Sequence, residues 1–294
     1  RSGVAERQEV SAVLTDVLHA GEEVYVKPLL IGLPNRHNIL FDLQTNRLVS
    51  WWQGDVAHQR TQGKTWFWDV PEKSWMTVKE KESQLQLQIE GRRLAPVALG
   101  QFVTEVDQWQ HIAAGIQFRY RLHFDTGSSE KLVITVQEKL TSLPASGQQS
   151  GWQRQLEVSD VPAGATLLLR VAELEQLPSK KINVASRQVD FLQEGGVQLR
   201  LPKAMGKLTD DGWVQVSGSP DANRPVSLDL VYRSDFPVDR FPQLPLSVPP
   251  PKPVALSIVP GFDAVRLPLA VDLMPTAMSW DPKGRLFLTS LKGR

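Results

Sequence analysis

The sequence predicts an all-β protein whose main domain is an antiparallel β-sandwich of supersandwich or jelly-roll-like type. Three observations predict this fold class. Apolar residues alternate strictly with polar residues from Ile116 to Phe124, as in a strand with one buried face. Turn motifs separate such stretches, among them Asp125-Thr126-Gly127 and Pro162-Ala163-Gly164. The segments between strands also lack the helical pattern that a parallel α/β sheet requires.

Residues 24–236 carry this strand pattern along their length and are assigned to one β-sandwich domain. Leu85 to Ile89 and Val226 to Leu230 alternate in the same way as Ile116 to Phe124. Further strands are expected over 24–33, 38–43, 46–52, 131–139, 153–158, 165–172, 196–201 and 212–217. Many short antiparallel strands with one solvated face favour two packed sheets or a barrel.

Residues 1–23 precede this domain and are expected to hold one short helix. Between Glu6 and His19, apolar side chains recur at the spacing of a helix face: Val10, Val13, Leu14, Val17 and Leu18. Gly21 is suited to end the helix. A short helix with one apolar stripe must pack against another element.

Two segments follow the β domain. Residues 237–257 are expected to form a semi-rigid linker, because seven prolines between Pro237 and Pro253 fix an extended backbone and remove hydrogen-bond donors. Within residues 258–294, the pattern predicts a hairpin whose strands run from Thr276 to Trp280 and from Arg285 to Ser290. Two strands alone are marginally stable in water, so this hairpin needs the sandwich or further strands.

Composition excludes several function classes. The net charge is +1 and the charges are interspersed, so neither nucleic acid nor an anionic membrane is expected as the main partner. The absence of cysteine excludes disulfides, thiolate metal sites, iron–sulfur clusters and thioether-attached haem, and no cofactor is expected. No apolar run reaches the ~20 residues of a membrane span, and no secretory leader pattern is present. Arg1 and Arg294 are expected to be cut ends.

The tail resembles the opening blade of β-propellers in sugar-dehydrogenase-like and related six-bladed proteins. The features that carry the resemblance are Pro260-Gly261-Phe262, Met274-Pro275-Thr276-Ala277, Trp280-Asp281-Pro282-Lys283-Gly284-Arg285-Leu286, Thr289-Ser290 and Gly293-Arg294. With the segment from Ile31 to Asp55, the chain is similar to large secreted multidomain proteins of planctomycete type, which often also carry cytochrome c modules. The resemblance implies an extracytoplasmic protein, periplasmic or secreted, and a truncated first blade at residues 258–294. No Cys-x-x-Cys-His motif is present, and no catalytic residue carries over.

One aromatic cluster is the main candidate ligand site. It contains Trp51, Trp52, Asp55, His58, Arg60, Trp66 and Trp68, with Trp75 beyond. Indoles stack on sugar faces while charged groups bond hydroxyls, so the cluster suits carbohydrate binding. The competing interpretation is that the aromatics fill the core between sheets. If 46–52 is a strand, Trp51 and Trp52 face opposite sides, and only one can join the site.

Three weaker patterns each have a simpler explanation. Arg119, Arg121 and His123 share one strand face and could bind an acidic sugar, but such a face normally pairs with cross-strand carboxylates. Glu173 and Glu175 could form a glycosidase pair, although surface carboxylates are common. Gly63-Lys64-Thr65 lacks the first glycine of a phosphate loop, because position 58 is a histidine. The five histidines show no metal-ligand spacing.

These patterns favour a non-catalytic carbohydrate-binding or scaffolding module of an exported multidomain protein. A second interpretation is that the chain is a fragment of a propeller or haem oxidoreductase whose catalytic part lies elsewhere, with a partner chain completing the propeller. A third is a sugar-active enzyme on a mutarotase-like sandwich, which would require histidine and carboxylates to converge on a concave sheet face.

Overall fold

The computed structural model describes residues 11–62, 65–70, 74–77, 82–129, 131–171, 182–192, 196–202, 206–218, 224–237, 258–264 and 275–290. The chain divides into two compact units, Arg1–Phe241 and Pro242–Arg294. The division falls inside the residues assigned from the sequence to the linker, 237–257. Most of that linker lies outside the described residues, so its conformation stays a prediction.

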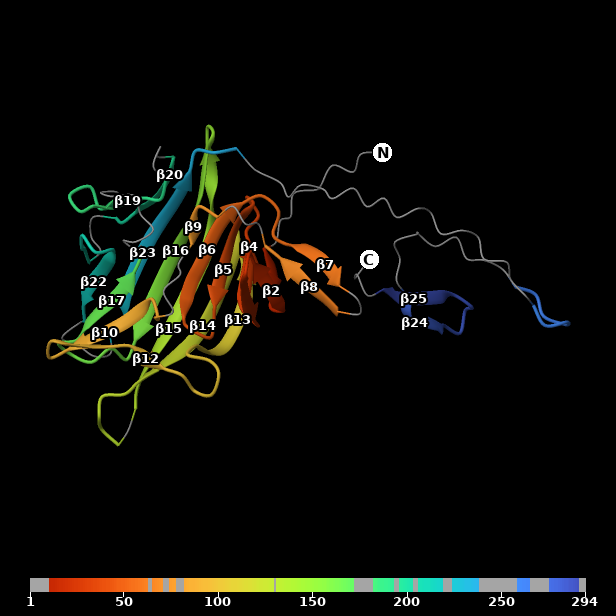
Figure 1. Cartoon of the computed structure of the whole chain (residues 1–294), viewed down its shortest axis with the longest axis horizontal. Coiled ribbons are helices and arrows are strands. Elements are labelled where there is room, and N and C mark those ends of the chain that lie inside the picture. The colour runs from red at the N-terminus through yellow and green to blue at the C-terminus, as the bar shows by residue number, and fades with distance from the viewer. Residues whose placement is uncertain are drawn as a thin grey trace. The chain divides into compact units, whose positions relative to one another are not determined.

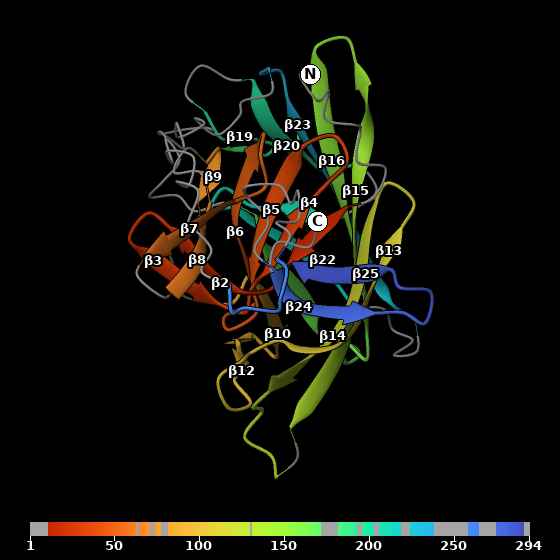
Figure 2. The same cartoon turned by 90° about the vertical axis from the view of Figure 1, so that its right-hand side faces the viewer.

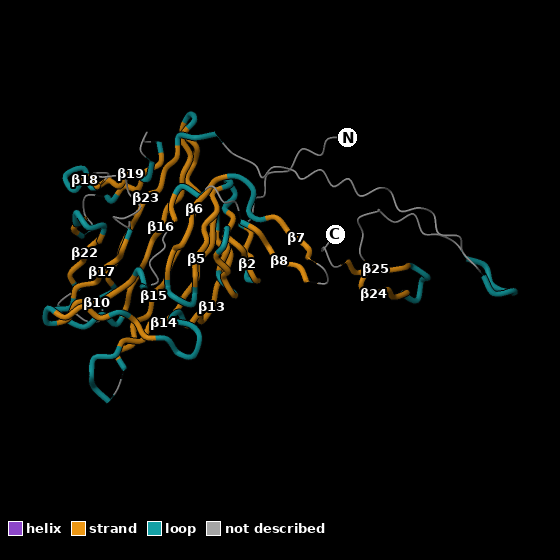
Figure 3. Tube along the Cα trace, in the orientation of Figure 1, coloured by secondary structure: helices purple, strands orange, loops and turns teal. Residues whose placement is uncertain are grey.

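Every regular element among the described residues is a β-strand, which confirms the all-β class (Figure 3). The strands predicted from alternation are present. β10 (Leu85–Ile89), β14 (Gly115–Phe124) and β23 (Val226–Ser234) cover the three clearest alternating stretches. Within the described ranges, the strand pairs are antiparallel except for the short pairing of β2 with β8, whose bounds are given below.

The first unit contains a nine-stranded sheet, the long sheet, whose longest strands lie side by side in Figure 1. Its order is β12, β14, β15, β16, β23, β20, β19, β18, and β13 also pairs with β14. The strands not yet introduced are β12 (Pro96–Val97), β13 (Glu105–Ile112), β15 (Leu132–Ser146), β16 (Gln149–Ser159), β18 (Ile182–Asn183), β19 (Gln188–Asp190) and β20 (Val197–Arg200).

Two five-stranded sheets cover the inner face of the long sheet. The central sheet has the order β1 (Ala12–Leu14), β4 (Leu29–Gly32), β5 (His37–Asp42), β6 (Arg47–Gln53) and β9 (Met76–Thr77). The side sheet has the order β11 (Arg92–Leu94), β10, β17 (Thr166–Arg170), β22 (Trp213–Ser217) and β21 (Lys207–Leu208).

The main hydrophobic core fills the space between the long sheet and these two sheets. From the long sheet, Phe118 and Tyr120 pack against Phe41 of the central sheet, with ring centroids 5.5 and 6.1 Å apart. Leu87 and Leu167 of the side sheet belong to the same buried cluster. One continuous core therefore joins three sheets, and its apolar burial is the main stabilising contribution to the unit.

A second, smaller core lies on the other face of the central sheet. It is closed by the small sheet, of order β3 (Glu23–Val26), β2 (Val17–Ala20), β8 (Thr65–Asp69) and β7 (His58–Gln62), which Figure 2 shows as a separate group of strands. Leu40 and Trp52 of the central sheet meet Leu18 and Tyr25 there. Because both faces of the central sheet are covered, β4, β5 and β6 are buried at every position.

The predicted N-terminal helix is wrong over residues 11–20, which form β1 and β2 instead. The Asp16 carboxylate accepts a hydrogen bond from the N–H of Val17 (2.8 Å) where the chain bends between the two strands. β1 then pairs with β4, and β2 with β3. Valine-rich residues suit strands, and this tertiary pairing outweighs their helical spacing. Residues 1–10 lie outside the described residues.

Among its described residues, the second unit forms a hairpin of β24 (Pro275–Trp280) and β25 (Leu286–Ser290), as the sequence predicted. The Asp281 carboxylate accepts hydrogen bonds from the backbone N–H groups of Lys283 and Arg285, both at 2.9 Å, and fixes the turn. These bonds, the one from Arg285 first, hold the pKa of Asp281 below its usual range. Whether this hairpin opens a propeller blade stays a prediction.

Candidate functional site

Trp51 and Trp52 are core residues, and they project to opposite faces of β6. Trp51 is fully buried in the main core, where its ring centroid lies 5.3 Å from Trp75 and 5.5 Å from Tyr232. Trp52 is 1% exposed in the small core, and its indole N–H donates to the carbonyl of Asp55 (2.9 Å). Neither indole has surface left for stacking on a ligand, so the core interpretation is confirmed for both.

Other members of the aromatic cluster lie on or beside the small sheet. Asp55 is exposed and precedes β7, and His58 is partly exposed in β7 opposite Asp69. Trp68 packs partly against the small core, and its indole N–H donates to the Asp16 carboxylate (3.3 Å). Arg60 and Trp66 lie in β7 and β8, but their side chains lie outside what the structure describes.

A histidine of the central sheet and a serine of the long sheet meet beside Trp51, in an arrangement unsuited to nucleophilic catalysis. His37 is fully buried, and its Nε2 lies 3.0 Å from the Ser150 hydroxyl. Its Nδ1 accepts a hydrogen bond from the indole N–H of Trp51 (3.0 Å), so the proton of the neutral ring must sit on Nε2. Burial lowers the pKa of His37 to about 3. A ring that already donates to the serine cannot take its proton, which makes the pair structural.

The cationic face of β14 pairs with carboxylates, as its simpler interpretation predicted. Arg121 bonds Glu105 at 2.9 Å and Asp107 at 3.1 Å, and Arg119 lies 3.8 Å from Asp107. His123 Nε2 lies 2.9 Å from the Glu105 carboxylate, and this hydrogen bond is the main cause that lowers the pKa of Glu105. His123 and Glu105 therefore lie on an outer, solvated face of the sheet, and they hydrogen-bond each other.

A buried ionic network crosses the long sheet from β14 to β16. The Tyr120 hydroxyl donates to Glu138 Oε2 (3.0 Å), and Arg154 Nε donates to Glu138 Oε1 (2.7 Å). Arg154 also donates to Gln84, the residue before β10 (3.3 Å). Glu138 and Arg154 are 0% and 2% exposed. No ligand can reach these groups without opening the core, so the network belongs to the packing of the sheets.

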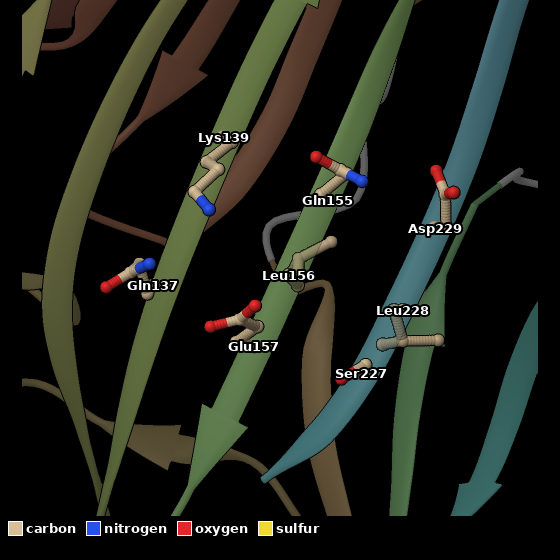
Figure 4. Close-up of a pocket in the computed structure, with 8 residues that line it drawn as sticks. All are labelled: Gln137, Lys139, Gln155, Leu156, Glu157, Ser227, Leu228 and Asp229. Atoms are coloured by element: carbon tan, nitrogen blue, oxygen red, sulfur yellow. The ribbon is translucent and has the colours of Figure 1, made fainter. Parts of the chain in front are cut away.

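The outer face of the long sheet carries a shallow groove of about 170 Å³ that the sequence analysis did not single out. Figure 4 shows polar side chains projecting from three neighbouring strands, β15, β16 and β23. The polar lining residues are Gln137, Lys139, Gln155, Glu157, Ser227 and Asp229, with Leu156 and Leu228 completing the lining.

The strand register arranges these groups in two rows. Gln137 faces Glu157, which faces Ser227, and Lys139 faces Gln155, which faces Asp229. Gln153 donates to both Asp229 oxygens, at 2.7 and 2.9 Å, and so orients that carboxylate. Among the described residues, the other five side chains make no mutual hydrogen bond or ion pair, so their donors and acceptors are available to a ligand.

The sequence signal for this groove is the set of polar residues that alternate with buried residues along each of the three strands. Each polar pair taken alone indicates only a solvated face, and the register that aligns the three strands is not readable from spacing.

A second hollow, of about 390 Å³ and mostly apolar, is lined by Leu43, Leu99, Phe102 and Val106, with Lys27 among its polar lining residues.

Several other candidates have no support in the described part of the chain. No group of three or more histidine or acidic side chains gathers there in a way that could hold a metal ion. No helix within it is long and apolar enough to cross a membrane. Glu173, Glu175, Gly63 and Lys64 lie outside the described residues.

Compared with known proteins, the chain matches no family model, no curated protein and no solved structure. The likeness of residues 258–294 to a sugar-dehydrogenase-like propeller therefore stays a prediction.

Proposed function

We propose that this chain is a non-catalytic recognition module, a β-sandwich of supersandwich or jelly-roll-like type, that binds carbohydrate on the outer face of its long sheet. The observation that carries the proposal is the groove of Figure 4, where amide, ammonium, hydroxyl and carboxylate groups stand on adjacent strands. Donors and acceptors at strand spacing suit a ligand with many hydroxyls.

The size and openness of the groove determine how such a ligand would bind. Small-molecule pockets typically enclose roughly 300–1,000 Å³, whereas this groove holds about 170 Å³. A chain of sugars would therefore lie across the strands and place one unit in the groove. Lys139 and Gln155 would donate to its hydroxyls, and Glu157 would accept from them. In an exported multidomain protein, such a module attaches its neighbours to a glycan.

Glycan-array binding by the full chain tests this proposal. Lys139→Ala, Gln155→Ala and Glu157→Ala should each weaken glycan binding by about tenfold, because each removes a polar partner of the ligand. Gln215→Ala, in β22 of the side sheet, is the matched control and should leave binding unchanged. Trp68→Ala separates this groove from the aromatic cluster on the small sheet. If no glycan binds the intact chain, the carbohydrate proposal fails and scaffolding between domains is what remains.

The hairpin of the second unit favours one alternative. In that alternative, the chain is a fragment of a propeller oxidoreductase whose catalytic part lies elsewhere. Met278, Trp280 and Phe287 are 74%, 64% and 54% exposed on this two-stranded sheet. Further strands supplied by a partner chain would cover these residues and complete the blade. Co-purification from the native source, followed by intact mass, tests this. A monomer that ends at Arg294 and carries no partner would contradict it.

A further inference from the structure

We propose that two copies of this chain associate through the free edge of β13, with Trp109 of one copy opposite Trp109 of the other. β13 pairs along one edge with β14, and among the described residues no strand pairs with its second edge. Figures 1 and 2 both show it at the margin of the long sheet. An edge strand with unpaired backbone groups is a template for another strand.

The length of β13 distinguishes it from most other edges of the first unit. The long sheet ends elsewhere in β12 and β18, the central sheet in β9, and the side sheet in β11 and β21, and each of these strands has two or three residues. Such short strands offer little backbone for pairing. β13 has eight residues, and its register with β14 is regular from Gln108 to Ile112, beyond a bulge between Val106 and Gln108.

The backbone of β13 directs specific groups outward. Ile112 and Gly115 face one another across a two-residue turn, so they form the hydrogen-bonded pair that closes the hairpin. Along an antiparallel ladder, hydrogen-bonded pairs alternate with pairs that are not hydrogen-bonded. The backbone groups of Gln110 and Gln108 therefore also bond to β14. The N–H and C=O groups of Trp109 and His111 consequently point to the free edge. A second copy centred on Trp109 would exchange backbone hydrogen bonds with these groups.

The side chains of the same segment are exposed and self-complementary. Asp107, Gln108, Trp109, Gln110 and His111 are all exposed, and Trp109 keeps 44% of its surface. Antiparallel pairing about Trp109 sets Gln108 opposite Gln110 of the second copy. Facing indoles and facing amides are favourable cross-strand pairs. The edge carries no lysine or proline that would block pairing.

Sedimentation of the full chain from micromolar to near-millimolar concentration tests the proposal. We expect a reversible monomer–dimer equilibrium that Trp109→Lys weakens by about tenfold or more, because two ammonium groups then face each other on the two-fold axis. Mixing the Trp109→Lys and Trp109→Glu variants should restore dimers. His111→Pro should also weaken dimerisation, since it removes an outward N–H and leaves the ladder with β14 intact. Far-ultraviolet spectra confirm that each variant folds.

Hydrogen exchange provides a readout that depends on the backbone alone. The amides of Trp109 and His111 should become protected as concentration rises, whereas the amide of Gln110, bonded to β14, should be protected throughout. Trp280→Lys, at an exposed tryptophan of the second unit, is the control and should leave dimerisation unchanged. The proposal is overturned by a chain that stays monomeric at the highest concentration. It is also overturned by self-association that persists in Trp109→Lys and disappears in Trp280→Lys.

Discussion

His37 illustrates how a single core residue makes stability depend on pH. Its neutral ring bridges Trp51 and Ser150, and burial lowers its pKa from 6.5 to about 3. The unfolded chain takes up a proton near pH 6.5, whereas the folded chain does not until about pH 3. The contribution of His37 to stability is therefore complete above pH 6.5 and is lost as pH falls, by at most about 1.4 kcal/mol per pH unit.

Urea unfolding at roughly pH 7 and pH 5 checks this first prediction. We expect the parent chain to lose about 2 kcal/mol more between these values than His37→Gln, which cannot titrate. Carboxylates with lowered pKa, such as Glu105 and Asp281, are the same in the parent and in His37→Gln, so their pH dependence cancels in this comparison. Gln215→Ala removes no titrating group, so it is the control and should keep the full loss. An equal pH dependence in the parent and His37→Gln would contradict the assignment.

The aromatic cluster shows what spacing reveals about individual residues and what it does not. Assigning residues 46–52 to a strand implied that Trp51 and Trp52 face opposite sides, but strand geometry does not indicate that both sides are buried. That outcome depends on the small sheet, whose strands come from residues before β4 and after β6. His37 could not be assigned a role from sequence either, because its partner Ser150 lies 113 residues away.

Strands could be predicted in this chain where one face is exposed to solvent, because apolar and polar residues then alternate along the sequence. β14 and β23 satisfy this condition. The failure at residues 11–20 has a physical cause, since β1 and β2 are short and their partners β4 and β3 follow them in sequence. Local spacing there resembled a helix face, and only pairing with later strands distinguishes the two structures.

At the scale of elements, the Glu138–Arg154 pair links β15 to β16 inside the core. Burial opposes the charged form of Arg154, but Glu138, together with Tyr232 and Tyr120, more than offsets this and raises its pKa. Arg154→Met would leave the Glu138 carboxylate buried without its cation. We expect this substitution to reduce the free energy of unfolding by about 3–5 kcal/mol, measured by urea denaturation.

Two variants test whether the unpaired charge causes this loss. Adding Glu138→Gln to Arg154→Met removes the remaining charge, and the double variant should be more stable than Arg154→Met alone. Arg121→Met makes the same change in a half-exposed ion pair and should cost less than about 1 kcal/mol. Similar losses in Arg121→Met and Arg154→Met would show that burial does not govern the effect.

At the scale of the whole molecule, the two units differ in how much apolar surface they bury. Both cores are formed by residues of the first unit, whereas the hairpin of the second leaves Met278, Trp280 and Phe287 exposed. Three or more strands, or packing against another element, are needed for a sheet to be independently stable. The stability of the described residues should therefore reside in the first unit.

Thermal unfolding of shortened chains checks this last prediction. A chain of residues 1–241 should melt cooperatively within about 2 °C of the full chain, because removing the hairpin takes away neither core. It should also retain any dimerisation through β13, which lies in the first unit. Residues 242–294 alone should show no cooperative transition, since two strands bury too little apolar surface to offset their conformational entropy. A cooperative melt of the isolated tail, or a loss of many degrees on its removal, would mean that the hairpin has a core partner.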